Sequence, residues 1–288
     1  MTVLLATVTA GKVGLYLAVV AVGVLSGILS ALLGVGGAVV TTPAVRFMGA
    51  TPIEAVGSTV PAILPGAISG SWRYAKEGLV EWRTALGLGA AGALFAVGGA
   101  VLSEYVDGRV LMLLTAALML WSGISVARGG RKGPAPTGPP AAAGVAEASA
   151  TAAPATATVL RDVPRHSVGT IAGLGAVAGF VAGLLGVGGG IVMVPMLTGP
   201  LKFPVRAATA SSLVAVAIFS LPALLTHAVL GHINWFFATA LMIGVVPGAQ
   251  IGASLTIRSS ERTIRLAFGG FIVLMALVFA ATQLLVGS

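Results

Sequence analysis

The sequence predicts an all-α polytopic membrane protein with two inverted repeats of about five membrane segments each and short broken helices at glycine-rich motifs. Three observations lead to this fold class. The 288 residues include only 16 Lys+Arg and 8 Asp+Glu, whereas an average soluble chain of this length carries about 72 charged residues. Apolar residues make up 57% of the chain and come in blocks of about 20, the length that spans a bilayer. The glycine and proline motifs of the first half recur in the second.

The composition also excludes several classes of protein. So few charges cannot cover the surface of a soluble domain, which argues against a cytosolic enzyme, a disordered chain and a secreted scaffold. The chain has no cysteine, so disulfides and thiolate metal sites are excluded. The net charge is +8, but the basic residues stand singly near the ends of apolar blocks. This distribution favours orientation in a lipid bilayer over binding of nucleic acid.

Five apolar segments are predicted in each half. The first has no basic leader and no cleavage site followed by polar sequence, so we interpret it as a retained span and not as a signal peptide. The second segment of each half is short: 14 helical residues reach about 21 Å against roughly 30 Å of hydrocarbon. The ten segments are 13–33, 36–49, 54–71, 84–102, 109–127, 168–185, 188–200, 206–226, 236–256 and 263–285.

A polar stretch divides the two halves. Six of the 15 prolines lie between residues 129 and 165, together with many alanines and threonines and no large apolar cluster. Such a composition is typical of a flexible linker outside the membrane. The predicted organisation is a first membrane repeat at 1–128, a Pro/Ala-rich cytoplasmic linker at 129–166 and a second membrane repeat at 167–288.

The two halves repeat each other in sequence. ALLGVGGAVVTTP at 31–43 matches GLLGVGGGIVMVP at 183–195 with an offset of 152, and residues 31–60 share 10 identities with 183–212 without a gap. Further on, with one residue inserted, YAKEGLVEW at 74–82 matches HAVLGHINW at 227–235. Repeats of this kind are common in secondary transporters.

The basic residues decide between eight and ten crossings. If the short segments do not cross, the repeats are parallel, and a cytoplasmic linker puts 9 Lys+Arg inside and 7 outside. If they cross, the repeats are inverted, with 13 inside and only Lys12, Arg46 and Arg109 outside. The second split is the one that the positive-inside rule predicts. We therefore expect ten crossings, a cytoplasmic linker and both termini outside.

The glycine clusters between a long and a short segment are the main candidates for a binding site. Clustered glycine should unwind the helix, and bare backbone N–H groups are tolerated in a membrane only where they face protein or a watery cavity. A helix that restarts there directs its N–H groups and positive dipole end into the cavity, which suits an anion. The candidates are Gly34, Gly36, Gly37, Gly186, Gly188, Gly189 and Gly190, followed by Pro43 and Pro195 as pathway candidates.

Hydroxyl groups near these motifs are further candidates. Ser58 and Thr59 in the first half and Ser211 and Ser212 in the second would either coordinate an oxyanion or bond their own helix backbone. Gln250, a polar residue inside a late span, is a candidate for the pathway.

Two titratable residues and four glycines outside the glycine clusters also have predicted roles. Glu54 and His227 are the candidates for carrying a proton, although charged groups at span ends more often snorkel to the interface. Glycines at four-residue spacing predict close helix packing. These are Gly23, Gly27, Gly175 and Gly179.

Signatures of enzyme chemistry are absent from the sequence. It contains no GxSxG, no HExxH, no GK[ST] and no histidine cluster with metal-ligand spacing. We therefore predict no catalytic residue, no metal and no cofactor. Without a nucleotide-binding motif, an ion or substrate gradient has to drive transport.

On the repeated GLLGVGGG-x₄-P element, the hydroxyl cluster and the [YH]-A-x₂-G-x-[VI]-x-W segment, the sequence resembles the sulfite exporter TauE/SafE family, also called the toluenesulfonate uptake permease family. The resemblance covers both halves and omits only the linker. It implies a secondary carrier of the plasma membrane for small sulfur-containing anions such as sulfite or organosulfonates. One departure is Ala38, where the second copy has Gly190.

Two alternatives to this function stay open. One is a carrier or channel for another small organic anion, and the other is a non-transport scaffold subunit that anchors a partner through the linker. Coupling to protons and the oligomeric state also stay open.

Overall fold

The computed structural model describes residues 2–129 and 166–286, and in these ranges every regular element is an α-helix. The predicted linker falls almost entirely on residues 130–165, outside the described ranges. The ten helices are α1 (Thr2–Leu33), α2 (Ala38–Phe47), α3 (Pro52–Lys76), α4 (Trp82–Tyr105), α5 (Gly108–Gly129), α7 (Val168–Leu185), α8 (Gly190–Thr198), α9 (Val205–Val229), α10 (Trp235–Arg258) and α11 (Glu261–Val286).

The helices form a bundle with an apolar outer surface, as expected for a protein in lipid. Six of them, α1, α4, α5, α7, α9 and α10, contain stretches long and apolar enough to cross a membrane. Large apolar side chains such as Leu17, Leu94 and Leu277 point outward. The predicted class, an all-α polytopic membrane protein, is confirmed. The short helices α2 and α8, with 10 and 9 residues, extend only about 15 Å and cannot cross alone.

Glycine faces hold the most extensive helix pairs together. Helix α1 runs parallel to α10, because Gly23 meets Leu241 while Gly27, further along α1, meets Val245 and Ala249. Helix α7 runs parallel to α4 in the same way, with Gly175 on Leu88 and Gly179 on Gly92. Close approach of this kind is the usual role of small residues in membrane helices. The packing role predicted for these four glycines is confirmed.

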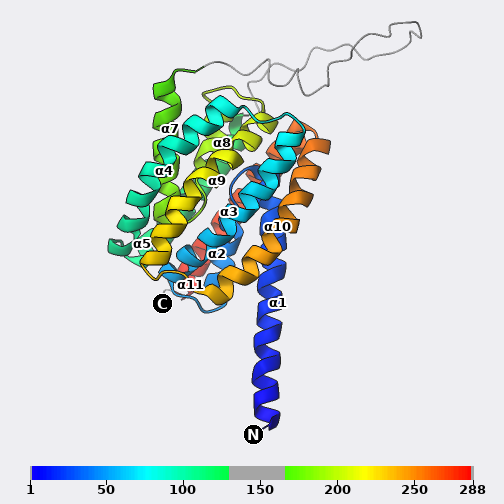
Figure 1. The fold of residues 1–288 in the computed structure, drawn as a ribbon, viewed down its shortest axis with the longest axis vertical. Helices are drawn as coiled ribbons and strands as arrows, with labels where there is room; N and C mark the ends of the chain where they lie inside the picture. The colour runs from blue at the N-terminus through cyan, green and yellow to red at the C-terminus, as the bar shows by residue number, and fades with distance from the viewer. Residues whose placement is uncertain (1, 130–165, 287–288) are drawn as a thin grey trace, which may run out of the picture.

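The main helix pairs join one half to the other and occur in two equivalent sets. The contact of α1 with α10 corresponds to that of α7 with α4, and α3 on α10 corresponds to α9 on α4. Helix α3 packs against α9, its own counterpart, and α5 packs against α11. The cross-half pairs are much more extensive than the contacts inside either half, so the two halves are interleaved (Figure 1).

The two ends of the bundle differ in charge. Helix α10 finishes at the end where α9 starts, since the Arg206 side chain donates to the Ser259 carbonyl at 2.5 Å. Helix α3 finishes at the same end, since Arg73 and Arg258 line one groove. We call this the arginine-rich end, and Arg73, Arg206 and Arg258 lie there. The opposite end carries Arg46 and holds the starts of α3, α5 and α10. The N-terminal end of α1 and the C-terminal end of α11 lie on that opposite side (Figure 1).

Helix bounds correct the register of the repeat. Helices α1 and α7 end with an offset of 152, whereas α3 and α9 begin at Pro52 and Val205, an offset of 153 that continues through α4 and α10. The extra residue therefore lies in the loop before α9, upstream of the place that the sequence alignment gave it. Ser58 corresponds to Ser211, and the aligned pair Pro52 and Pro204 is out of register.

Candidate functional site

The two glycine segments lie against each other inside the bundle. A Cβ added at Gly36 would lie 3.1 Å from the Cα of Gly188 and 3.2 Å from its carbonyl oxygen. A Cβ at Gly188 would lie 3.0 Å from the Val35 carbonyl oxygen. Gly190 in turn lies against the Gly34 carbonyl. The backbones therefore meet directly, and no side chain fits between them.

The helix is interrupted at both segments, as the glycine clusters predict. Gly34, Gly36 and Gly37 have φ of 73°, 92° and 84°. Their counterparts Gly186, Gly188 and Gly189 have φ of 65°, 81° and 58°. Residues with a Cβ rarely adopt these conformations. Six glycines thus permit two unwound segments in the same conformation.

Two helices begin at this junction without a side-chain cap. Gly37 precedes α2 and Gly189 precedes α8, and neither first turn receives a side-chain hydrogen bond. In contrast, Thr51 and Glu54 form a capping box at α3, and Ser167 caps α7. An uncapped helix start carries roughly half a positive charge on its free N–H groups. Both positive ends lie at the contact between the two glycine segments.

Thr59 and Ser212 hold the two segments in place. The Thr59 hydroxyl donates to the Val56 carbonyl at 2.8 Å and lies 3.4 Å from the Gly186 carbonyl. The Ser212 hydroxyl lies 3.1 Å from the Gly34 carbonyl and 2.9 Å from the Thr209 carbonyl. The two hydroxyls are counterparts at the corrected offset. The structure thus brings both of these predicted residues to the glycine segments, bonded to backbone.

Ser58 and Ser211 contact other parts of the chain. Ser58 Oγ accepts from the Asn234 N–H at 2.8 Å, and Ser211 Oγ accepts from the Glu81 N–H at 2.9 Å. Asn234 and Glu81 are the N-cap residues of α10 and α4. These two predicted residues therefore fix the turns that lead into α4 and α10.

Thr209 belongs to the same hydroxyl cluster as Ser211 and Ser212 in the sequence but is not among the predicted site residues. It is fully buried, and its Oγ1 has no hydrogen-bond partner. It lies beside the first glycine segment, because a Cβ at Gly34 would come within 2.9 Å of the Thr209 Cα. At the corrected offset its counterpart is Val56, which lies beside Gly186 in the same way. A comparison of the two halves would have identified Thr209 as a polar residue opposite an apolar one, Val56. That comparison requires the offset of 153, and the sequence alignment used 152.

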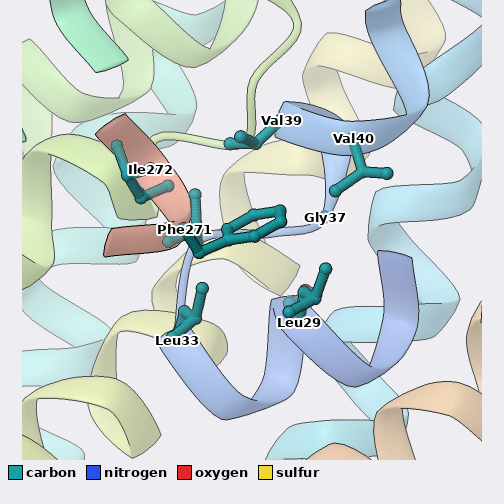
Figure 2. Close-up of a pocket in the computed structure, with 9 residues that line it drawn as sticks. Leu29, Leu33, Gly37, Val39, Val40, Phe271 and Ile272 are labelled. Carbon is teal, nitrogen blue, oxygen red and sulfur yellow. The ribbon is translucent and has the colours of Figure 1, made fainter. Parts of the chain in front are cut away.

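The space at the glycine segments is small in this conformation. Figure 2 shows a cavity beside Gly37, enclosed by apolar side chains that include Leu33 and Phe271. Its volume is about 10 Å³, which holds one water molecule at most. This volume is too small for any polyatomic anion in the conformation described.

Pro43 and Pro195 lie buried inside α2 and α8. Because proline has no N–H, each removes one hydrogen bond from a helix of only two to three turns. The two residues therefore weaken the short helices just beyond the glycine segments.

Gln250 lies in a different place, a surface groove between α3 and α10 near the arginine-rich end. The groove has a volume of about 320 Å³ and is lined by Arg73 and Arg258 together with Gln250 and Ser254. The Gln250 amide donates to the carbonyl and the hydroxyl of Ser69 at 2.8 and 2.9 Å. Gln250 thus lies in this groove and not at the glycine segments.

The two candidates for carrying a proton differ in burial: Glu54 lies in an exposed helix cap, and His227 lies inside the bundle. The Glu54 carboxylate accepts from the Thr51 N–H at 2.8 Å within the α3 cap, a structural role. His227 is fully buried, and both of its ring nitrogens have partners.

The family model described as "Sulfite exporter TauE/SafE" matches residues 19–279. The chain is 30% identical over 259 residues to a protein of Xylella fastidiosa (strain Temecula1) named "Probable membrane transporter protein", covering 88% of this chain and 91% of that protein. A similarly named protein of Bacillus subtilis is 26% identical over 86% of this chain and 91% of its own length. Another, from Methanocaldococcus jannaschii, is 22% identical over 89% of this chain and 92% of its own length. No solved structure matches the chain.

Proposed function

The chain belongs to the sulfite exporter TauE/SafE family of multi-pass membrane transporters, and we propose that it is a secondary transporter of small sulfur-containing anions such as sulfite or organosulfonates. Its membrane is the plasma membrane. The observation that carries the choice of an anion is the direct contact of Gly36 with Gly188, where α2 and α8 both begin uncapped. Two helix starts supply about one positive charge in total, which offsets a monovalent oxyanion without a lysine or arginine in the middle of the bundle.

The proposed topology has ten crossings and inverted repeats. Helix α1 ends near the end of α3, since the Tyr74 hydroxyl donates to the Ala31 carbonyl at 2.7 Å. Because α3 begins at the opposite end, residues 34–51 have to traverse the bundle, and α2 supplies only the last part of that path. Residues 186–204 likewise have to traverse the bundle, in the opposite direction, and α8 supplies only part of that path. The arginine-rich end would then face the cytoplasm, in agreement with the positive-inside rule.

The proposed binding site joins the glycine segments with Thr209. Backbone N–H groups at the starts of α2 and α8 would bind the anion's oxygens, and the Thr209 hydroxyl would donate to a third oxygen. Thr59 and Ser212 would hold the segments, and Ser58 and Ser211 the neighbouring turns. The Gly37 cavity of about 10 Å³ corresponds to a closed state. Movement of one helix set against the other would open it to alternate faces.

The groove at Gln250 is the proposed approach for the anion. Arg73 and Arg258 line it together with polar Gln250 and Ser254. Basic residues at the mouth of a pathway raise the local concentration of an anion. Gln250 would then act near the entrance, while Pro43 and Pro195 would act at the flexible short helices.

The test is flux into proteoliposomes with sulfite, sulfate, sulfoacetate and taurine as a panel. A carrier should show saturation and counterflow for at least one sulfur-containing anion. Gly188→Val should abolish this flux, because the added side chain meets the Val35 carbonyl and the positive φ disfavours it. Gly98→Val is the matched control, since nothing lies within 4 Å of a Cβ at Gly98.

Each alternative function has its own outcome in this assay. Flux without saturation or counterflow indicates a channel. Flux of other organic anions alone would move the substrate outside the sulfur compounds. A folded protein with no anion flux would support a scaffold and overturn the proposal.

A further inference from the structure

A ring nitrogen and a phenol occupy equivalent positions in the two halves. The Tyr74 hydroxyl of α3 donates to the carbonyl of Ala31 at 2.7 Å, three residues before the first glycine segment. Nε2 of His227 in α9 lies 3.0 Å from the carbonyl of Gly183, three residues before the second. Tyr74 and His227 are counterparts at the offset of 153, and Ala31 and Gly183 at 152. Each half thus ties the last turn before its break to a neighbouring helix.

At this position the second half uses an imidazole where the first half uses a phenol. A phenol stays protonated far above pH 7, whereas imidazole changes charge between about pH 5 and 8. His227 also has a partner that Tyr74 lacks: its Nδ1 lies 3.1 Å from Nδ1 of His232. Both rings are buried, with His227 at 0% and His232 at 8% exposure.

The contacts determine where the protons are. A carbonyl oxygen only accepts, so His227 Nε2 carries the hydrogen that is donated to Gly183. In neutral His227 the other nitrogen, Nδ1, then has to accept. The hydrogen between the two rings therefore belongs to Nδ1 of His232, and His232 Nε2 is left with its lone pair. One further proton fits at that Nε2, but a second would put hydrogens on both facing Nδ1 atoms and break the contact.

The charged surroundings of the pair favour a single added proton. Glu104 of α4 is the carboxylate that acts on His232. Glu54 of α3 is occupied in the helix cap. Helices α7 and α8 contain no charged residue. The charged residues of α9 and α10, apart from His227, are Arg206 and Arg258, and both lie at the arginine-rich end. Arg46, Asp107 and Arg109 lie at the same end of the bundle as His232, but Glu104 is the charged group that acts on His232. An added proton would therefore meet that carboxylate first.

We propose that His227 and His232 form a proton-binding site, and that one proton held there couples anion transport to the pH gradient. The proposal rests on the function proposed above. A proton from the aqueous phase adds to His232 Nε2, with Glu104 as its counter-charge, and is released to the opposite phase when the anion leaves. The added charge lies one ring beyond His227, which contacts Gly183 just before the second glycine segment, and there it would strengthen the attraction for an anion. The anion and the proton would therefore bind together.

The decisive variant is His227→Tyr, because it installs the donor that the first half already uses. Wild-type protein in proteoliposomes should show a several-fold change of anion flux when a pH gradient is imposed, with opposite signs for the two polarities. His227→Tyr and His232→Gln should lose that response. His166→Gln, which removes the third histidine of the chain, should keep it. A wild-type response in His227→Tyr would overturn the proposal.

A titration that needs no transport separates this proposal from the proposed function. The three histidines, labelled with ¹⁵N, can be followed by NMR from about pH 8 to about pH 5. We expect His227 Nε2 to stay protonated throughout, while His232 Nε2 gains the single proton of the pair. Independent titration of the two rings, or a deprotonated His227 Nε2, would refute the pair even if the protein transports anions. If His227→Tyr stops all flux, or no tested anion moves, this titration decides.

Discussion

Thr209 and Ser211 lie two positions apart on α9 but have different environments. Thr209 Oγ1 is buried without a partner beside Gly34, whereas Ser211 Oγ accepts from the Glu81 N–H. A buried hydroxyl without a partner is unfavourable unless a ligand or water uses it. At the residue scale this difference separates a candidate ligand from a structural residue.

Thr209→Val should weaken anion transport with little loss of stability. The shape of the side chain is kept, and Val56 already occupies the equivalent position in the first half. Loss of one hydrogen bond of about 0.5–1.5 kcal/mol should raise KM roughly 2- to 12-fold. Ser211→Ala, in comparison, should lower the unfolding temperature and leave KM close to the wild-type value. Flux kinetics and thermal unfolding of both variants check this, and an unchanged KM in Thr209→Val removes Thr209 from the site.

His232 should make the stability of the protein fall in acid. Burial lowers the pKa of His232 below its usual value, with Glu104 opposing the shift. The unfolded chain therefore binds the proton before the folded one does, so the stability is full above the ordinary histidine pKa and decreases as the pH falls below it. We expect the unfolding temperature in detergent to decrease from about pH 7 to about pH 5, with a smaller decrease in His232→Gln. Equal decreases in both proteins would contradict this assignment.

At the scale of elements, the helix pairs α1–α10 and α7–α4 depend on backbone contact. A Cβ at Gly179 would collide with the Gly92 carbonyl, and one at Gly27 with the Val245 carbonyl. Membrane helices gain stability mainly from such close packing, because lipid provides no hydrophobic force between them. Both pairs join the first half to the second.

Gly179→Leu should therefore destabilise the protein strongly. Overpacking typically costs about 1–3 kcal/mol, and here the obstacle is backbone, which cannot move aside. Gly173→Leu, on the same helix, is the control, since nothing lies within 4 Å of a Cβ there. The yield of monodisperse protein and its unfolding temperature distinguish the two variants. If both behave alike, α7 does not pack on α4 as described.

The elements also show which features a single sequence can predict. The glycine breaks, the packing glycines and most helix ends follow from local rules of backbone conformation and hydropathy, and these predictions agree with the structure. The register of α9 was not predicted correctly. The extra residue lies in the loop before α9, and an accidental match of Pro52 with Pro204 hides it in the alignment. The role of Thr209 and the pairing of His227 with His232 depend on which helices meet, and hydropathy carries no such information.

At the scale of the whole molecule, the helix directions and the charge distribution support the same topology. Helix α3 ends at the arginine-rich end and its counterpart α9 ends at the opposite one. Equivalent positions of the two halves should therefore face opposite sides of the membrane.

Cysteine labelling can test this orientation, since the chain has no native cysteine. Glu77 and Leu230 are the C-cap residues of α3 and α9 and equivalent in the repeat. Glu77→Cys and Leu230→Cys should react with impermeant thiol reagents from opposite faces, as should Ala143→Cys and Val286→Cys. Labelling of Glu77→Cys and Leu230→Cys from one face would establish parallel repeats and end the ten-crossing model.

The interleaving of the halves has a consequence for biosynthesis. Helices α1 and α4 find their main partners, α10 and α7, only in the second half. While the ribosome is still translating residues 130–165, the glycine faces of both helices are exposed to lipid. Contacts among the first-half helices are much less extensive than those with the second half, so most of the native packing forms only after α7 and α10 have emerged. During that interval the unpaired glycine faces can associate with a neighbouring nascent chain, which makes the rate of translation through the second half a determinant of correct assembly.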